Sequence, residues 1–121
     1  MAELDEAAVV KPAKADARTL LEGLVGEEIP TMTGVPNRVL RIEGSHVIVG
    51  TGKSPHGKPV EIADVQDAID RLWRDGVVEI NVDFVGRRSA FIGAVLQSIP
   101  GTIASTNPRV VRLERRPPQD R

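Results

Sequence analysis

The stretch IADVQDAIDRLWRDGVVEINVDF, residues 62–84, decides the fold class. Its first part has apolar residues at helical spacing, with aspartate and arginine on the opposite side, so we predict an amphipathic helix over 62–74. Asp75-Gly76 is expected to end this helix. From Val78 to Phe84 apolar and polar residues alternate, which is typical of a half-buried strand. The predicted apolar face of the helix consists of Ile62, Val65, Ile69, Leu72 and Trp73.

The chain before this stretch predicts a helix and a hairpin. Asp16 is expected to cap a short helix that Gly26 closes. A short extended piece over 29–33 is expected to follow. Residues 38–51 predict a hairpin that turns at 43–46. The next loop, 52–59, holds two glycines, two prolines, two lysines and a histidine, so we expect it to be exposed and mobile.

The chain after this stretch predicts a third helix and a second hairpin. Ser89 is expected to cap a helix over 90–99, which has no charged residue and should be buried on nearly every side. A last hairpin is expected over 102–105 and 109–114. The fold class is therefore α+β, with a mostly antiparallel sheet of two hairpins and a central strand and three helices packed on it. We expect residues 1–15 to be a flexible arm, 16–114 a single domain and 115–121 a disordered basic tail.

Composition excludes several kinds of site. Among 121 residues there are no cysteines, which rules out disulfides and thiolate metal ligands, and only two histidines. The three aromatic residues all read as core, so an aromatic platform for single-stranded nucleic acid is not expected. We expect neither a metal nor another cofactor. The acidic start and the absence of a long apolar run predict a cytoplasmic protein without a membrane partner.

No motif predicts catalysis. Gly52-Lys53-Ser54 resembles the end of a phosphate-binding P-loop, but Val47 stands where the first glycine is needed. Pro55 and Pro59 also prevent the helix that must follow. The Gly-x-Ser-x-Gly elbow of serine hydrolases does not occur. The aspartates of the helix over 62–74 are interpreted as surface partners of its arginines. We therefore predict no catalytic residues, with an unrecognised enzyme kept as a third alternative.

Charge is distributed in blocks. The net charge is −1, yet residues 31–60 have four bases and one acid (+3), and residues 91–121 have five bases and two acids (+3). Residues 1–30 and 61–90 have excess acid, with three bases against seven acids (−4) and four against seven (−3). Folding could gather the two basic blocks on one face, opposite the aspartate-rich helix. The alternative is that the basic residues are scattered over the surface and only face solvent.

Basic and polar residues of the hairpin, its loop and the segment before the third helix are the candidate phosphate contacts. Positive side chains there would position a duplex without reading its sequence. In the third helix only Ser89, Gln97 and Ser98 have side chains that could reach a base edge, so this helix is expected to be scaffold. The alternatives to phosphate contact are that the loop is flexible and its charges only face solvent, and that residues 87–88 form a solvent-exposed turn. The candidate DNA-binding residues are Arg38, Arg41, Lys53, Ser54, His56, Lys58, Arg87 and Arg88.

Four strings carry a family resemblance: GVPNRVL (34–40), VGTGKSPHGKPV (49–60), VQDAIDRL (65–72) and RSAFIGAVL (88–96). They resemble an N-terminal accessory domain of actinobacterial McrA-like HNH restriction endonucleases, the type IV, modification-dependent class. The resemblance implies a non-catalytic domain that contacts double-stranded DNA, modified or unmodified. It also implies the other domains of the parent endonuclease as partners, because this chain lacks the HNH motif.

A second function remains open from the sequence. The chain could instead be a protein-interaction or dimerisation module that assembles a larger nuclease. The short apolar strands of the hairpin over 38–51 are the edge expected to pair with a partner. Oligomeric state stays undetermined at this point.

Overall fold

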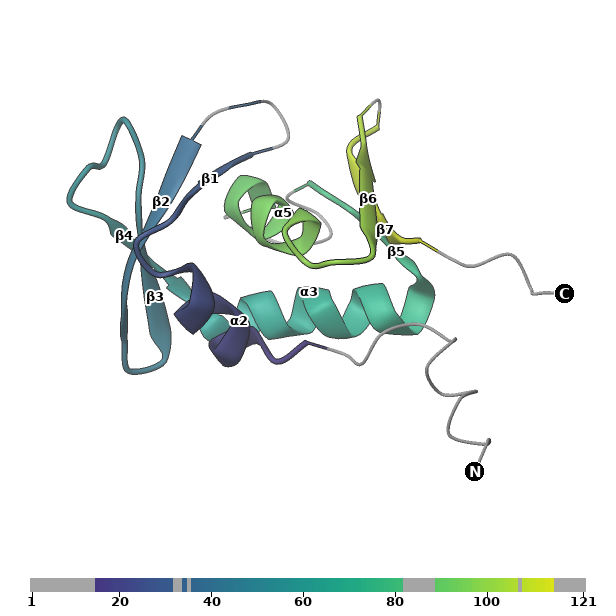
Figure 1. Ribbon diagram of the computed structural model, residues 1–121, viewed down its shortest axis with the longest axis horizontal. Helices are drawn as coiled ribbons and strands as arrows, with labels where there is room; N and C mark the ends of the chain where they lie inside the picture. Colours follow the sequence, from purple (N-terminus) through teal and green to yellow (C-terminus); the bar gives the residue numbers. More distant parts are fainter. Residues whose placement is uncertain (1–14, 32–33, 35, 82–88, 107, 115–121) are drawn as a thin grey trace, which may run out of the picture.

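The computed structural model describes residues 15–31, 34, 36–81, 89–106 and 108–114. Its three described helices lie between and beside two groups of strands (Figure 1). The elements in chain order are α2 (Ala17–Leu24), β1 (Glu28–Pro30), β2 (Pro36–Glu43), β3 (His46–Gly50), β4 (Lys58–Glu61), α3 (Ile62–Asp75), β5 (Val77–Glu79), α5 (Ser89–Gln97), β6 (Thr102–Ser105) and β7 (Val110–Leu113).

The strands form two antiparallel sheets, one of four strands in the order β1-β2-β3-β4 and one of three in the order β5-β7-β6. They lie at opposite ends of the molecule in Figure 1, with α5 between them and α3 running below α5 from one end toward the other. The physical reason is α3: its 14 residues carry the chain about 20 Å, at 1.5 Å per residue, away from β4. Strand β5 therefore starts beyond the reach of the first sheet and pairs with the last hairpin.

The buried side chains of the three described helices and both sheets form one hydrophobic cluster. Helix α5 supplies its middle: every residue from Phe91 to Leu96 is buried, as the uncharged sequence predicts. Helix α3 contributes one face, including Trp73, and contacts α2, α5 and strands of both sheets. Gly76 ends α3 in the left-handed conformation (φ 82°), where its N–H donates to the Leu72 carbonyl (2.7 Å).

The α+β class is confirmed, and so are the three helices and both hairpins. Strand β4 was not predicted, and the expectation of an irregular loop through residue 59 is wrong from Lys58 onward. The expected free edge on the first hairpin is also wrong, because β2 and β3 are the central strands of their sheet and pair on both sides. The predictions for 1–14, 32–33, 82–88, 107 and 115–121 lie outside the described residues. No helix within the described ranges has the length and apolar character needed to cross a membrane.

The start of α2 is held from two sides. The Asp16 carboxylate accepts from the Thr19 N–H (3.0 Å), and the Gln66 side chain of α3 accepts from the Ala17 N–H (2.7 Å). The bond from the Thr19 amide, with a second from its hydroxyl, lowers the pKa of Asp16 from its ordinary 3.8. Asp16 therefore confirms the predicted helix cap.

We expect Asp16→Ala to lower the melting temperature by a few degrees at neutral pH. A carboxyl with a lowered pKa stabilises the fold above its unfolded pKa, and this stabilisation is lost as the pH falls through the lowered value. The difference between the variant and the wild type should consequently shrink in acid. Thermal melts at neutral and acidic pH test this, with Glu22→Ala as a control that removes an exposed carboxylate from the same helix without removing a cap. A deficit that persists unchanged in acid would argue against the cap.

Candidate anion-binding pocket

A pocket of about 300 Å3 lies between the four-stranded sheet and the first turn of α5. Its lining combines an apolar wall with hydroxyl, amide and ammonium groups. No acidic residue is among the described residues of this lining. The residues are Asn37, Val49, Thr51, Lys53, Ser54, Lys58, Val60, Ser89, Ala90 and Phe91.

Strand register explains why these residues meet. Lys58 of β4 pairs with Val49 of β3, so the two side chains project to the same face of the sheet. Because side chains alternate along a strand, Val60 shares that face with Lys58. On β2 the same alternation turns Asn37 and Val39 inward. The sheet face that packs on the core therefore also forms one wall of the pocket.

The loop that brings Lys53 and Ser54 to this wall is held by its own backbone. Thr51 and Ser54 exchange backbone hydrogen bonds (3.1 and 3.2 Å), and the Ser54 N–H also donates to the Thr51 hydroxyl (3.1 Å). The Ser54 carbonyl accepts from Gly57 (2.9 Å). Gly57 has φ 97° and packs so closely against the outer face of the sheet that a Cβ there would lie 2.4 Å from Ile48 Cγ2. These contacts hold residues 51–57 in a turn that packs on the sheet through Gly57, while Lys53 and His56 are exposed.

Asn37 is the most unusual member of the pocket. Its side chain is only 5% exposed, yet none of the described residues gives or takes a hydrogen bond with its amide group. A buried polar group left without a partner costs about 1–3 kcal/mol. Such a group in a folded protein calls for an explanation, and a ligand in the adjoining pocket is one.

The other polar side chains of the pocket are similarly available. Across the described ranges, Lys53 and Lys58 form no ion pair, and the hydroxyls of Ser54 and Ser89 have no hydrogen-bond partner. Ser89 is the first residue of α5, and the first amides of an α-helix have no carbonyl partner within the helix. Donors and positive charge therefore converge on one volume, and no carboxylate is among the described residues around it.

The remaining predicted residues do not join this pocket. Arg38 is exposed and its Nη1 donates to the Gly26 carbonyl (2.9 Å). Arg41 is exposed and pairs with the Glu43 carboxylate. His56 lies exposed in the turn, away from the pocket lining. Arg87 and Arg88 lie outside the described residues. The structure thus brings together Lys53, Ser54 and Lys58 from the predicted set.

Sequence reasoning missed Asn37 as a site residue. The hairpin was predicted to begin at residue 38, so Asn37 fell outside the strand and its inward position went unnoticed. Strand β2 in fact begins at Pro36. The signal was present: Asn37 and Val39 flank an exposed arginine, so the alternation places a polar amide on the apolar face.

Helix α5 has no free recognition surface, as its sequence predicts. Gln97 donates its side-chain amide to the Pro30 carbonyl (3.1 Å), and the Ser98 hydroxyl donates to the Val95 carbonyl (2.6 Å). Ser89 is the only one of the three predicted contact residues that faces the pocket. In the part of the chain that the structure describes, no three or more histidine or acidic side chains are grouped so as to hold a metal ion.

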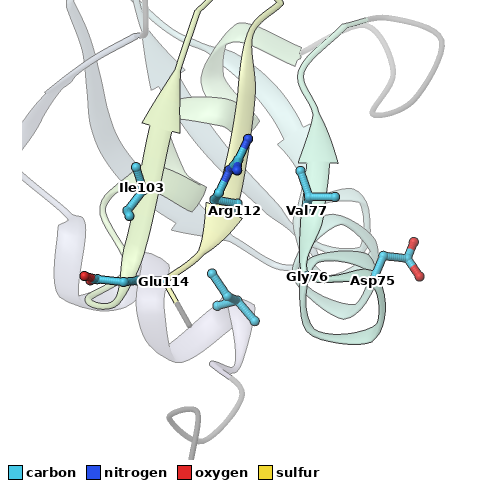
Figure 2. A pocket seen from close by; sticks show the side chains of 7 residues that line it. Asp75, Gly76, Val77, Ile103, Arg112 and Glu114 are labelled. Carbon is cyan, nitrogen blue, oxygen red and sulfur yellow. The ribbon is translucent and has the colours of Figure 1, made fainter. Parts of the chain in front are cut away.

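A wider hollow of about 620 Å3 lies on the outer face of the three-stranded sheet. Figure 2 shows Arg112 between Ile103 and Val77, a row that the strand pairing fixes. Asp75 and Glu114 also line it. The Asp75 carboxylate accepts hydrogen bonds from Nε and Nη2 of Arg74 (3.0 and 3.1 Å). That bond lowers the pKa of the Asp75 carboxyl. This hollow has mixed charge and, unlike the Asn37 pocket, no convergent set of donors.

Comparison with known proteins adds no assignment, because no family model, no curated protein and no solved structure matches this chain.

Proposed function

We propose that this chain is a non-catalytic DNA-binding domain that contacts the phosphate backbone of a duplex through Lys53, Lys58 and their pocket. The observation that supports the proposal most strongly is the acid-free lining of that pocket, where two lysines lie without an ion-pair partner among the described residues. Phosphate groups are the anions that such a surface recognises on DNA. An accessory role in a modification-dependent restriction endonuclease is the wider context that the resemblance suggests.

The proposed contact surface is centred on the two lysines. Of the described basic candidates, Arg38 and Arg41 are engaged by a carbonyl and a carboxylate, while the two lysines are available. We expect these lysines to position the duplex without reading its sequence. Helix α5 serves as scaffold under this proposal, because its buried residues and its engaged Gln97 leave no row of side chains for a major groove.

A salt titration tests the proposal. The dissociation constant of a short fluorescent duplex, measured at several salt concentrations, should rise with salt, with a slope of about 0.9 in log–log form for each phosphate contact. Binding that ignores salt, or no binding even at low salt, would contradict it. The finer expectation, that base modification changes the affinity, is tested by the same titration with methylated and unmethylated duplexes.

Self-association is a second candidate, supported by strand β6. The other three edge strands, β1, β4 and β5, each carry a charged residue or a proline, which discourage pairing with another chain. Strand β6 has neither, and its Ile103 is 45% exposed. An uncharged edge strand with an exposed apolar side chain suits pairing with a second copy of the chain.

We expect Ile103→Lys to abolish self-association if β6 is the contact, because a charge on an edge strand opposes strand pairing. Light scattering at high protein concentration measures the mass. Val25→Lys is the matched control, since Val25 is comparably exposed (41%) but lies at the end of α2. A wild type that stays monomeric, or an assembly that both variants retain, would reject β6 as an interface.

A further inference from the structure

Among its described residues, the pocket described above has two ammonium groups, three hydroxyls and one side-chain amide, and no carboxylate. Five of these groups come from three parts of the fold: Asn37 from β2, Lys53, Ser54 and Lys58 from the turn and β4, and Ser89 from α5. The nine-residue helix α5 begins at the pocket, and helix N-termini favour negative charge. The Asn37 side-chain amide is buried and has no hydrogen-bond partner among the described residues. This is a separate sign of a ligand, because neither the start of α5 nor the two lysines explains why a polar amide is buried there.

The chemistry of these donors selects among ligands. The described lining disfavours a cation, because it offers two ammonium groups and no carboxylate. A carboxylate presents two oxygens in one plane, whereas donors that approach from a sheet, a turn and a helix suit the tetrahedral oxygens of a phosphate. Four residues, Val49, Val60, Ala90 and Phe91, add an apolar wall. The volume of about 300 Å3 is at the lower end of small-molecule sites and leaves room for more than the phosphate itself.

We propose that this pocket binds one phosphate group, with the Asn37 amide as its innermost donor and the part of the ligand next to the phosphorus against the apolar wall. The inference rests on the proposed function only for the source of the phosphate group, which is then DNA. A small molecule that carries a phosphate is the other source, and the same side chains of the pocket would bind its phosphate.

Asn37→Leu tests the inner donor. Leucine keeps the size of the side chain and removes a buried polar group that lacks a partner, so the variant should melt at the same temperature as the wild type or higher. Its affinity for inorganic phosphate should fall roughly tenfold or more, the effect of losing one hydrogen bond to an anion. A folded Asn37→Leu variant that binds phosphate as well as the wild type overturns the inference.

The wild-type protein provides a second readout that no folding failure can obscure. The side-chain NH2 resonances of Asn37 are followed by NMR while inorganic phosphate is added, with chloride at equal ionic strength as control. We expect a saturable shift with phosphate and none with chloride. Equal small shifts with both salts overturn the inference.

The same resonances separate this inference from DNA binding. If a short duplex binds and shifts the Asn37 signals, DNA is the source of the phosphate. If the duplex binds but leaves Asn37 unmoved, the inference fails and the DNA-binding proposal stands. If inorganic phosphate shifts Asn37 but no duplex binds, the phosphate site stands and the DNA-binding proposal fails.

Discussion

Replacing Lys53 and Lys58 together by alanine is expected to weaken duplex binding roughly 100-fold at 50 mM salt and to reduce the log–log salt slope by about 2. Each lysine that neutralises one phosphate releases condensed counterions, which favours binding at low salt. The losses of affinity from removing the two lysines therefore multiply. Both side chains are exposed and neither forms an ion pair within the described ranges, so the melting temperature should stay nearly unchanged. Fluorescence anisotropy at several salt concentrations measures the affinity, and a thermal melt measures the stability.

The matched control for this double variant is Arg109→Ala with Arg112→Ala. It removes the same charge from exposed residues of the other sheet and its hairpin, away from the pocket. We expect the control to change the salt slope little. If the control lowers the affinity as much as the lysine variant, the effect is one of net charge, and the pocket is not the contact.

Gly57→Ala is expected to have the largest effect on stability, a loss of about 2–5 kcal/mol. One part is backbone strain, since φ 97° places an L-residue in the left-handed region at a cost of about 1–2 kcal/mol. The other part is overpacking, typically 1–3 kcal/mol, because the new Cβ would lie 2.4 Å from Ile48 Cγ2 and 2.9 Å from Leu40 Cδ1. Denaturant unfolding measures the difference in free energy.

Gly52→Ala is the control, because Gly52 belongs to the same loop, has no positive φ and has open space where a Cβ would go. It should be neutral or slightly stabilising. Gly57→Ala should also weaken DNA binding, since the turn it displaces carries Lys53 and Ser54. Equal stability of the two glycine variants would mean that this turn does not pack on the sheet as described.

Local sequence signals predicted most of the elements. Asp16, Gly76 and the uncharged stretch of α5 each act through neighbouring residues, so their effects are visible in the sequence. Strand β4 escaped notice because it holds one buried apolar residue, Val60, beside a proline that is tolerated only because β4 is an edge strand. The division into two sheets depends on how far α3 carries the chain, which is a long-range property.

The candidate site was predictable only in part. Lys53, Ser54 and Lys58 are close in sequence, and their turn and strand keep them together. The position of Ser89 in the same pocket as this turn depends on packing between segments more than 30 residues apart, which spacing does not reveal. Arg41 pairs with Glu43, two residues further along the same strand, a contact that the sequence analysis did not consider.

NMR mapping of a short duplex onto the backbone amides at low salt would locate the phosphate contacts of this protein. We expect shift changes concentrated at residues 51–60 and at 89–91, with the three-stranded sheet unchanged. Changes confined to β5, β6 and β7, or spread evenly over the surface, would contradict the claim that the pocket between the four-stranded sheet and α5 is where this protein meets phosphate.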